Sequence, residues 1–198
     1  MRTNTSTSTV LTMIATSILI LGLLQGCAGV LVAAGASAAA AAVDRRTAGT
    51  ILEDEAIELK IRNGIYQDKE LENKIHINVT SYNNVVLLSG EAPTTEMRDL
   101  AVNRAREVEK VKRVYNEIQL SPVSSLKARS TDTWITSKIK TALVGTQDIN
   151  TVHVKVITEN RTVYLMGLLS KEEGDIAGNV ASSVGGVQGV MKLFEFID

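Results

Sequence analysis

The chain has 198 residues, a single cysteine, and 21 basic against 22 acidic residues, which give a formal net charge of −1. This near-neutral balance provides no global field that would attract a nucleic acid, and a single cysteine excludes an internal disulfide. Aromatic residues make up only 4% of the chain, so its one tryptophan, Trp134, is a candidate for a specific role.

The N-terminal region begins with the basic Arg2 and continues with an apolar run over residues 10–24. The run leads into Leu-Gln-Gly-Cys at residues 24–27, with a branched apolar residue three positions before Cys27 and a small residue directly before it. This is the lipobox pattern of bacterial lipoproteins, and the run is too short for a comfortable transmembrane span. We therefore predict a signal peptide over residues 1–26 and lipidation of Cys27. The alternative is an ordinary signal peptide whose cysteine is incidental.

The segment after the predicted cleavage site indicates where the protein is sorted. Ala28, and not an aspartate, stands second after the cut. In Gram-negative lipoproteins an aspartate there commonly retains the protein at the inner membrane, so we predict a lipid-anchored outer-membrane protein that faces the periplasm. Residues 28–43 are almost all Ala, Gly and Val. We predict a lipidated tether over residues 27–50, with an apolar segment lying on the lipid surface as the alternative.

From Ile51 onward the sequence repeats itself. Ile57 matches Ile135, His76 matches His153, and Ala101 matches Ala177, so the shift falls from 78 to 77 to 76 positions. Single-residue deletions of this kind are tolerated in loops. We therefore predict two copies of one small domain, over residues 51–120 and 130–198, joined by a linker over residues 121–129.

The elements of each copy follow from its periodicity. Isoleucines at helical spacing after Asp54 and after Asp132 predict a first helix, with each aspartate as its candidate cap. Strict alternation over residues 75–79 and 152–156 predicts half-buried strands, and the pairs at 83–84 and 160–161 predict hairpin turns. A second strand, a second helix and a last strand complete each copy. We predict an α+β fold in which each αββαβ unit has a three-stranded mixed sheet with two helices on one face.

The helix-free faces of both sheets carry apolar residues as well. If Val86 and Leu88 face the helices, Leu87 faces the other way, and Tyr164 does so in the second copy. We predict that part of this surface is covered by the other domain and not by water.

The repeat resembles the BON domain, a small αββαβ module of bacterial periplasmic proteins. The resemblance rests on Lys60-Ile61, Val-Leu-Leu-Ser-Gly at residues 86–90 and the valines at 111 and 114, with their counterparts in the second copy. The first copy departs from the family at residues 109–110, where a glycine is common.

The order of parts, from the lipobox through Asp-Arg-Arg-Thr at residues 44–47 to the second copy, resembles outer-membrane lipoproteins with two BON domains. That resemblance implies a non-enzymatic protein that supports outer-membrane integrity and concentrates at division sites. It also implies that the first helix of the second domain binds anionic phospholipid.

The residue chemistry of that helix agrees with a lipid contact. Residues 131–145 carry two lysines against one aspartate, whereas residues 51–66 of the first copy sum to −2. Trp134 lies beside the apolar stripe with Lys138 and Thr141, and an indole next to an ammonium suits a lipid interface. The predicted lipid-contact residues are Trp134, Lys138, Thr141 and Leu143. The alternative is that Trp134 packs between the domains or against the linker.

Enzymatic signals are weak in this sequence. We interpret His76 and His153 as equivalent outward positions on two strands, and we predict no catalytic residues, no cofactor and no metal site. The predicted partner is an anionic phospholipid membrane, without nucleic acid. A protein-binding adaptor for outer-membrane protein assembly or for control of envelope hydrolases is the main alternative, and a small-ligand or ion-binding module is the third.

Overall fold

The computed structural model describes residues 44–197. The predicted signal peptide, the predicted lipidation site Cys27 and residues 28–43 of the predicted tether lie outside the described residues. Asp44–Asp198 forms one compact unit that holds both repeats and their cores. Within residues 44–197, no helix combines the length and the apolar character that a membrane crossing requires.

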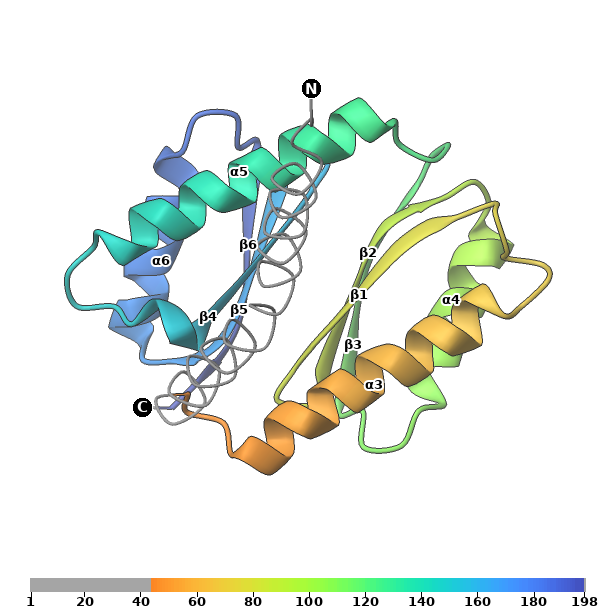
Figure 1. The fold of residues 1–198 in the computed structure, drawn as a ribbon, viewed down its shortest axis with the longest axis horizontal. Coiled ribbons are helices and arrows are strands. Elements are labelled where there is room, and N and C mark those ends of the chain that lie inside the picture. Colours follow the sequence, from red (N-terminus) through yellow and green to blue (C-terminus); the bar gives the residue numbers. More distant parts are fainter. Residues whose placement is uncertain (1–43, 198) are drawn as a thin grey trace, which may run out of the picture. The chain divides into compact units, whose positions relative to one another are not determined.

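Each repeat folds in the predicted order of helix, two strands, second helix and last strand (Figure 1). The first repeat consists of α3 (Ala48–Tyr66), β1 (His76–Tyr82), β2 (Val85–Ala92), α4 (Thr95–Arg106) and β3 (Arg113–Leu120). The second consists of α5 (Leu126–Val144), η1 (Thr151–His153), β4 (Val154–Glu159), β5 (Thr162–Leu169), α6 (Lys171–Ser183) and β6 (Gly189–Phe196).

The middle strand of each sheet pairs antiparallel with the strand before it and parallel with the last strand. The two helices of a repeat cover one face of its sheet (Figure 1). Ile57, Ile61 and Ile65 of α3 form the core of the first repeat with residues of β1 and β2, and Ile135, Ile139 and Leu143 of α5 do so in the second. The predicted α+β fold with two mixed sheets is therefore confirmed.

The first helix of each repeat begins earlier than the apolar spacing indicates. The side chains of Thr47 and Ser125 cap α3 and α5 by accepting a hydrogen bond from the backbone N–H three residues later. As a result, α3 begins within the predicted tether over residues 27–50, and α5 begins within the predicted linker over residues 121–129.

The prediction that Asp54 and Asp132 cap these helices is wrong, because both lie inside a helix and are buried. The carboxylate of Asp54 accepts hydrogen bonds at 2.8 Å from the backbone N–H groups of both turn residues after β1, and one at 2.7 Å from Ser81 Oγ. Asp132 accepts two bonds of 2.9 Å from the equivalent turn of the second repeat. Each aspartate thus ties a helix to a hairpin.

These hairpin turns have the predicted geometry. Asn83 and Asn84 have φ angles of 53° and 66°, and Asn160 and Arg161 have φ angles of 46° and 61°. Two successive residues with positive φ define a type I′ turn, which matches the twist of the flanking strands. The predicted hairpins at residues 83–84 and 160–161 are confirmed.

The first strand of the second repeat starts later than predicted. The alternation over residues 152–156 indicates a strand, yet Thr151–His153 forms the short helix η1 and β4 begins at Val154. The side chain of Asn150 accepts a hydrogen bond at 3.0 Å from the backbone N–H of Val152. Such a local bond favours a turn in competition with the strand ladder. His153 is consequently buried and does not point outward from a strand.

The helix-free faces of the two sheets share a third apolar cluster. Its buried members are Tyr82, Val85, Leu87, Tyr164, Met166 and Leu193. Because Leu87 and Tyr164 are buried, the prediction that the other domain covers part of these faces is confirmed. Burial of each large apolar side chain contributes about 1.5–3 kcal/mol, so this shared cluster binds the repeats into one unit.

Candidate functional site

Helix α5 is longer and more basic than the sequence pattern indicates. Ile135, Ile139 and Leu143 face the core, and the early start at Leu126 adds Lys127 and Arg129 to the helix. Four basic side chains then stand against Asp132 alone, a formal sum of +3, and Asp132 is occupied with the hairpin turn. The outer side of α5 therefore presents basic groups that no acidic residue of the same helix neutralises.

Trp134 lies on the outer side of α5 and is 65% exposed. The alternative that it packs between the domains or against the linker is therefore wrong. Thr141, two turns further on, is exposed as well, and Lys138 is half-buried and donates a hydrogen bond from Nζ to the backbone carbonyl of Gly185. The structure thus brings Trp134, Lys138 and Thr141 to one side of the helix.

Leu143 does not belong to this surface. It is only 1% exposed and packs in the core of the second repeat, so its predicted part in a lipid contact is wrong. The physical reason is its position four residues after Ile139, which puts both side chains on the same stripe of the helix. That spacing is visible in the sequence and would have placed Leu143 correctly.

Two other apolar residues of α5 are exposed and were not predicted. Leu126 is 78% exposed at the start of the helix, and Val144 is 72% exposed at its end. Their helical positions differ from that of Trp134 by about 80° at 100° per residue, so all three lie toward the outer side. The sequence signal for Leu126 was hidden because the helix was expected to begin later.

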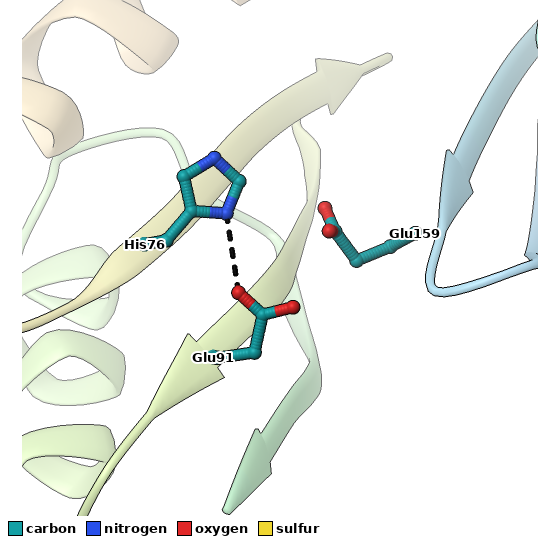
Figure 2. Close-up of side chains that lie close together, drawn as sticks. All are labelled: His76, Glu91 and Glu159. Carbon is teal, nitrogen blue, oxygen red and sulfur yellow. Dashed lines mark ion pairs between the residues drawn. The ribbon is translucent and has the colours of Figure 1, made fainter. Parts of the chain in front are cut away.

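A second cluster of interest combines side chains of both repeats. Figure 2 shows His76, Glu91 and Glu159, whose nearest ligand atoms all lie within 4.8 Å of one another. His76 Nδ1 lies 3.3 Å from a carboxylate oxygen of Glu91, and both carboxylates are buried. The pKa of Glu159 is raised to about 7, chiefly by burial and also by the charge of Glu91, against the opposing hydrogen bond from Asn78.

This cluster corrects the sequence-based interpretation of the histidines. His76 and His153 were predicted as equivalent outward positions, but His153 is buried and His76 faces two glutamates. The pairing of His76 with Glu91 follows from the register of the hairpin around Asn83-Asn84, which a two-residue turn fixes. The approach of Glu159 had no sequence signal, because it depends on how the two sheets pack.

A groove of about 480 Å³ runs between α5 and this cluster. Its lining includes Arg129, Thr133, Ser137 and Lys140 of α5, together with His76 and Asn78 of β1 and Glu159 of β4. The groove is polar on the side of α5 and reaches the boundary between the repeats. Nothing in its lining pairs a nucleophile with a general base in the manner of a hydrolase.

Comparison with known families finds the BON domain twice. The family model matches residues 53–122 and 131–198, which together span both repeats.

The relatives of this chain include three bacterial proteins that match it over most of its length. The chain is 37% identical over 175 residues to the outer membrane lipoprotein DolP of Haemophilus influenzae, which covers 88% of this chain and 91% of the relative. It is 39% identical to a 21 kDa hemolysin of Actinobacillus pleuropneumoniae, over 78% of this chain and 80% of the relative. It is 30% identical to the osmotically-inducible protein Y of Escherichia coli, over 72% of each chain.

Proposed function

Because the chain belongs to the BON-domain family and is similar over most of its length to an outer membrane lipoprotein, we propose that it is a lipid-anchored outer-membrane protein facing the periplasm. In this proposal Cys27 carries the lipid anchor, and helix α5 of the second BON domain contacts anionic phospholipid. The protein supports outer-membrane integrity as a non-enzymatic factor and acts at division sites. The similarity to DolP supports the general role in the cell envelope.

The observation that carries the lipid contact is the 65% exposure of Trp134 on a basic helix. An exposed indole in a chain with one tryptophan is costly to leave in water, and tryptophan is enriched where headgroups meet acyl chains. Each lysine or arginine near an anionic surface contributes about 1 kcal/mol of attraction. Trp134 and the basic residues of α5 therefore supply the two kinds of contact that an interfacial helix uses.

The surface of α5 also limits how deeply the helix can enter a membrane. Its apolar side chains at Leu126, Trp134 and Val144 are separated by Ser137 and Thr141, which are exposed and polar. The opposite side of α5 is buried in the core of the second repeat, so the helix stays packed on its domain when its outer side contacts a membrane. We therefore expect shallow contact at headgroup depth, with strong dependence on salt.

The test is sedimentation of the fragment 44–198 with vesicles. We expect binding to vesicles rich in phosphatidylglycerol and not to vesicles of phosphatidylcholine alone, with weaker binding at higher salt. Trp134→Glu should reduce the binding by about tenfold or more, because it removes the indole and adds a repelled charge. The matched control is Ala56→Glu, which introduces the same negative charge at the equivalent exposed position of α3 without removing an indole.

Thermal unfolding of both variants should stay close to that of the parent, because both positions are exposed. Equal vesicle binding by Trp134→Glu and the parent would contradict the proposed lipid contact. An absence of binding by the parent fragment would leave the anchor on Cys27 as the membrane contact and favour the adaptor.

A specific observation supports the adaptor as the second candidate. Leu52 and Leu59 of α3 are 67% and 55% exposed, and they lie seven residues apart on one side of the helix. Neither belongs to an apolar cluster of the described residues. Their surface suits a protein of the assembly machinery or an envelope hydrolase. Substitution of both leucines by glutamate should then abolish the binding of this partner protein without changing vesicle binding.

A further inference from the structure

We propose that His76, Glu91 and Glu159 form a binding site for a divalent transition-metal ion, with Zn²⁺ as the best match, at the boundary between the two repeats. This inference is independent of the lipid contact on α5. The ion would join two ligands of the first repeat to one ligand of the second.

The spacing of the ligand atoms supports this site. Zn²⁺ binds histidine nitrogen and carboxylate oxygen at about 2.0–2.2 Å, so two ligands of a tetrahedral site lie about 3.3 Å apart. His76 Nδ1 and the nearer oxygen of Glu91 already lie 3.3 Å apart. All three ligand atoms lie within 4.8 Å, so a change in the side-chain torsions of Glu159 is enough to complete the set.

The backbone positions of the first two ligands are fixed by the sheet. His76 and Glu91 are directly paired residues of β1 and β2, in a register that the type I′ turn and Asp54 hold. Glu159 is the last residue of β4, directly before the second type I′ turn. Ligands on strands that are held in this way lose little conformational freedom when an ion binds.

The electrostatics of the cluster favour a cation. Glu91 and Glu159 are both buried, and a buried carboxylate needs a positive charge or several hydrogen-bond donors. Asn78 Nδ2 donates one hydrogen bond of 2.7 Å to Glu159, and the backbone N–H of Ser124 donates one of 3.3 Å to Glu91. His76 Nδ1 is buried and has no hydrogen-bond partner among residues 44–197, although it faces the carboxylate of Glu91. A metal ion would satisfy this nitrogen and both carboxylates together.

The type of ligand selects the metal. An imidazole with two carboxylates suits Zn²⁺ and other first-row transition metals, whereas Mg²⁺ and Ca²⁺ prefer oxygen ligands alone. The groove of about 480 Å³ also touches His76 and Glu159, so it gives an ion a path to the site and room for a water as fourth ligand.

Because the two repeats are similar, the molecule has a second, equivalent place at their boundary, but the two glutamates are missing there. At the shift of 77 positions, His153, Leu168 and Tyr82 correspond to His76, Glu91 and Glu159. There the tyrosine hydroxyl donates a 3.3 Å hydrogen bond to the backbone carbonyl of His153. A carboxylate pair is thus present on one side only, which makes a single metal ion per chain the expected stoichiometry.

The test uses the fragment 44–198, which forms one compact unit and contains no cysteine that would bind zinc. Titration with Zn²⁺ at neutral pH, followed by calorimetry, should give one site per chain and a higher melting temperature. His76→Ala and Glu159→Gln should each weaken the affinity by more than about tenfold and abolish the thermal shift. Mg²⁺ should produce neither effect.

Glu172→Gln is the matched control, because it removes an exposed carboxylate of α6 and should leave Zn²⁺ binding unchanged. Glu159→Gln keeps the shape of the side chain, so a folded variant is expected even if His76→Ala is unstable. Co²⁺ provides a second readout, since a visible absorption band should appear with the parent and disappear in Glu159→Gln. An affinity for Zn²⁺ that is unchanged in both ligand variants, or no binding by the parent, would overturn the proposal.

Discussion

Helices α3 and α5 occupy the same place in the two BON domains and pack apolar residues at equivalent positions onto their sheets. Their outer sides differ, because besides the buried Asp54 α3 carries three acidic residues against Lys60 and Arg62, whereas besides the buried Asp132 α5 carries four basic residues and no acidic one. The position of Trp134 in α5 is held by Ala56 in α3. Duplication has thus preserved the side of each helix that the sheet constrains and left the outer side free to acquire different partners.

The buried aspartates show the same contrast inside the molecule. Asp54 and Asp132 both hold a type I′ turn, but within the part of the chain that the structure describes only Asp54 also forms an ion pair, with Arg46 at 2.9 Å. The guanidinium of Arg46 in turn stacks on the ring of Tyr82, with 3.8 Å between its central carbon and the ring centroid. The first repeat therefore depends on the segment that precedes its helix, and the second repeat has no such dependence through Asp132.

The largest loss of stability is expected when the equivalent glycines of β2 and β5, Gly90 and Gly167, are substituted. Gly90 has a φ of 119°, and a Cβ there would lie 2.0 Å from the carbonyl oxygen of His76. At the equivalent Gly167 the same contact would be 2.4 Å, to His153, without a positive φ. Gly90→Ala should lower the free energy of unfolding by about 3–5 kcal/mol and Gly167→Ala by less, as urea denaturation would measure. A larger loss in Gly167→Ala would contradict the role assigned to the positive φ.

Neutralising the buried carboxylates of Asp54 and Asp132 should cause the next largest loss in the free energy of unfolding. Asp54→Asn should cost about 2–4 kcal/mol, because it weakens two turn hydrogen bonds and leaves Arg46 without one of its anionic partners. Asp132→Asn should cost about 1–2 kcal/mol, since it affects the turn alone. Chemical denaturation of both variants tests this order. Arg46→Ala is the control, and combining it with Asp54→Asn should add little further loss if the ion pair explains the difference.

The smallest change in stability is expected when an indole and an added basic charge, the two kinds of group that distinguish the outer side of α5, are introduced on the outer side of α3. Ala56→Trp together with Glu55→Lys should leave stability within about 0.5 kcal/mol, because both positions are exposed. The double variant should bind vesicles rich in phosphatidylglycerol more tightly than the parent, by up to about fivefold. Ala56→Trp alone serves as the control for the indole without the added charge. Weaker binding by the double variant would show that the lipid contact depends on more than these surface groups.

The fold could be predicted because each repeat confirms the other. Two copies with the same spacing of isoleucines, the same alternating strands and the same asparagine-containing turns leave few arrangements, and the apolar residues Leu87 and Tyr164 then require that the helix-free faces be covered. The prediction of Asp54 as a helix cap was wrong because an aspartate can also accept hydrogen bonds from the backbone of a hairpin that is distant in the sequence. Local sequence rules describe the nearest backbone, and the turn lies some thirty positions away, with Asp54 bonding to Asn83 and Asn84.

The candidate site was predicted unevenly for a similar reason. Trp134 and Thr141 could be placed on the outer side of α5 from helical spacing, and Leu143 could have been excluded by the same rule. His76 and Glu91 are joined by a register that the turn fixes. Glu159 approaches them only because two sheets pack together, and no periodicity within one strand reports the contact between two domains.

The apolar cluster shared by the two helix-free faces has a consequence for biosynthesis. A chain that emerges from its N-terminal end completes the first repeat while Tyr164, Met166 and Leu193 are still unmade or inside the export channel. During that interval the apolar sheet face formed by Tyr82, Val85 and Leu87 is exposed and can associate with other proteins, including other nascent copies. Holding that surface in solution is a task for a chaperone of the compartment where the chain folds. A chain truncated after the first repeat would leave this apolar face without the cover that the second repeat provides.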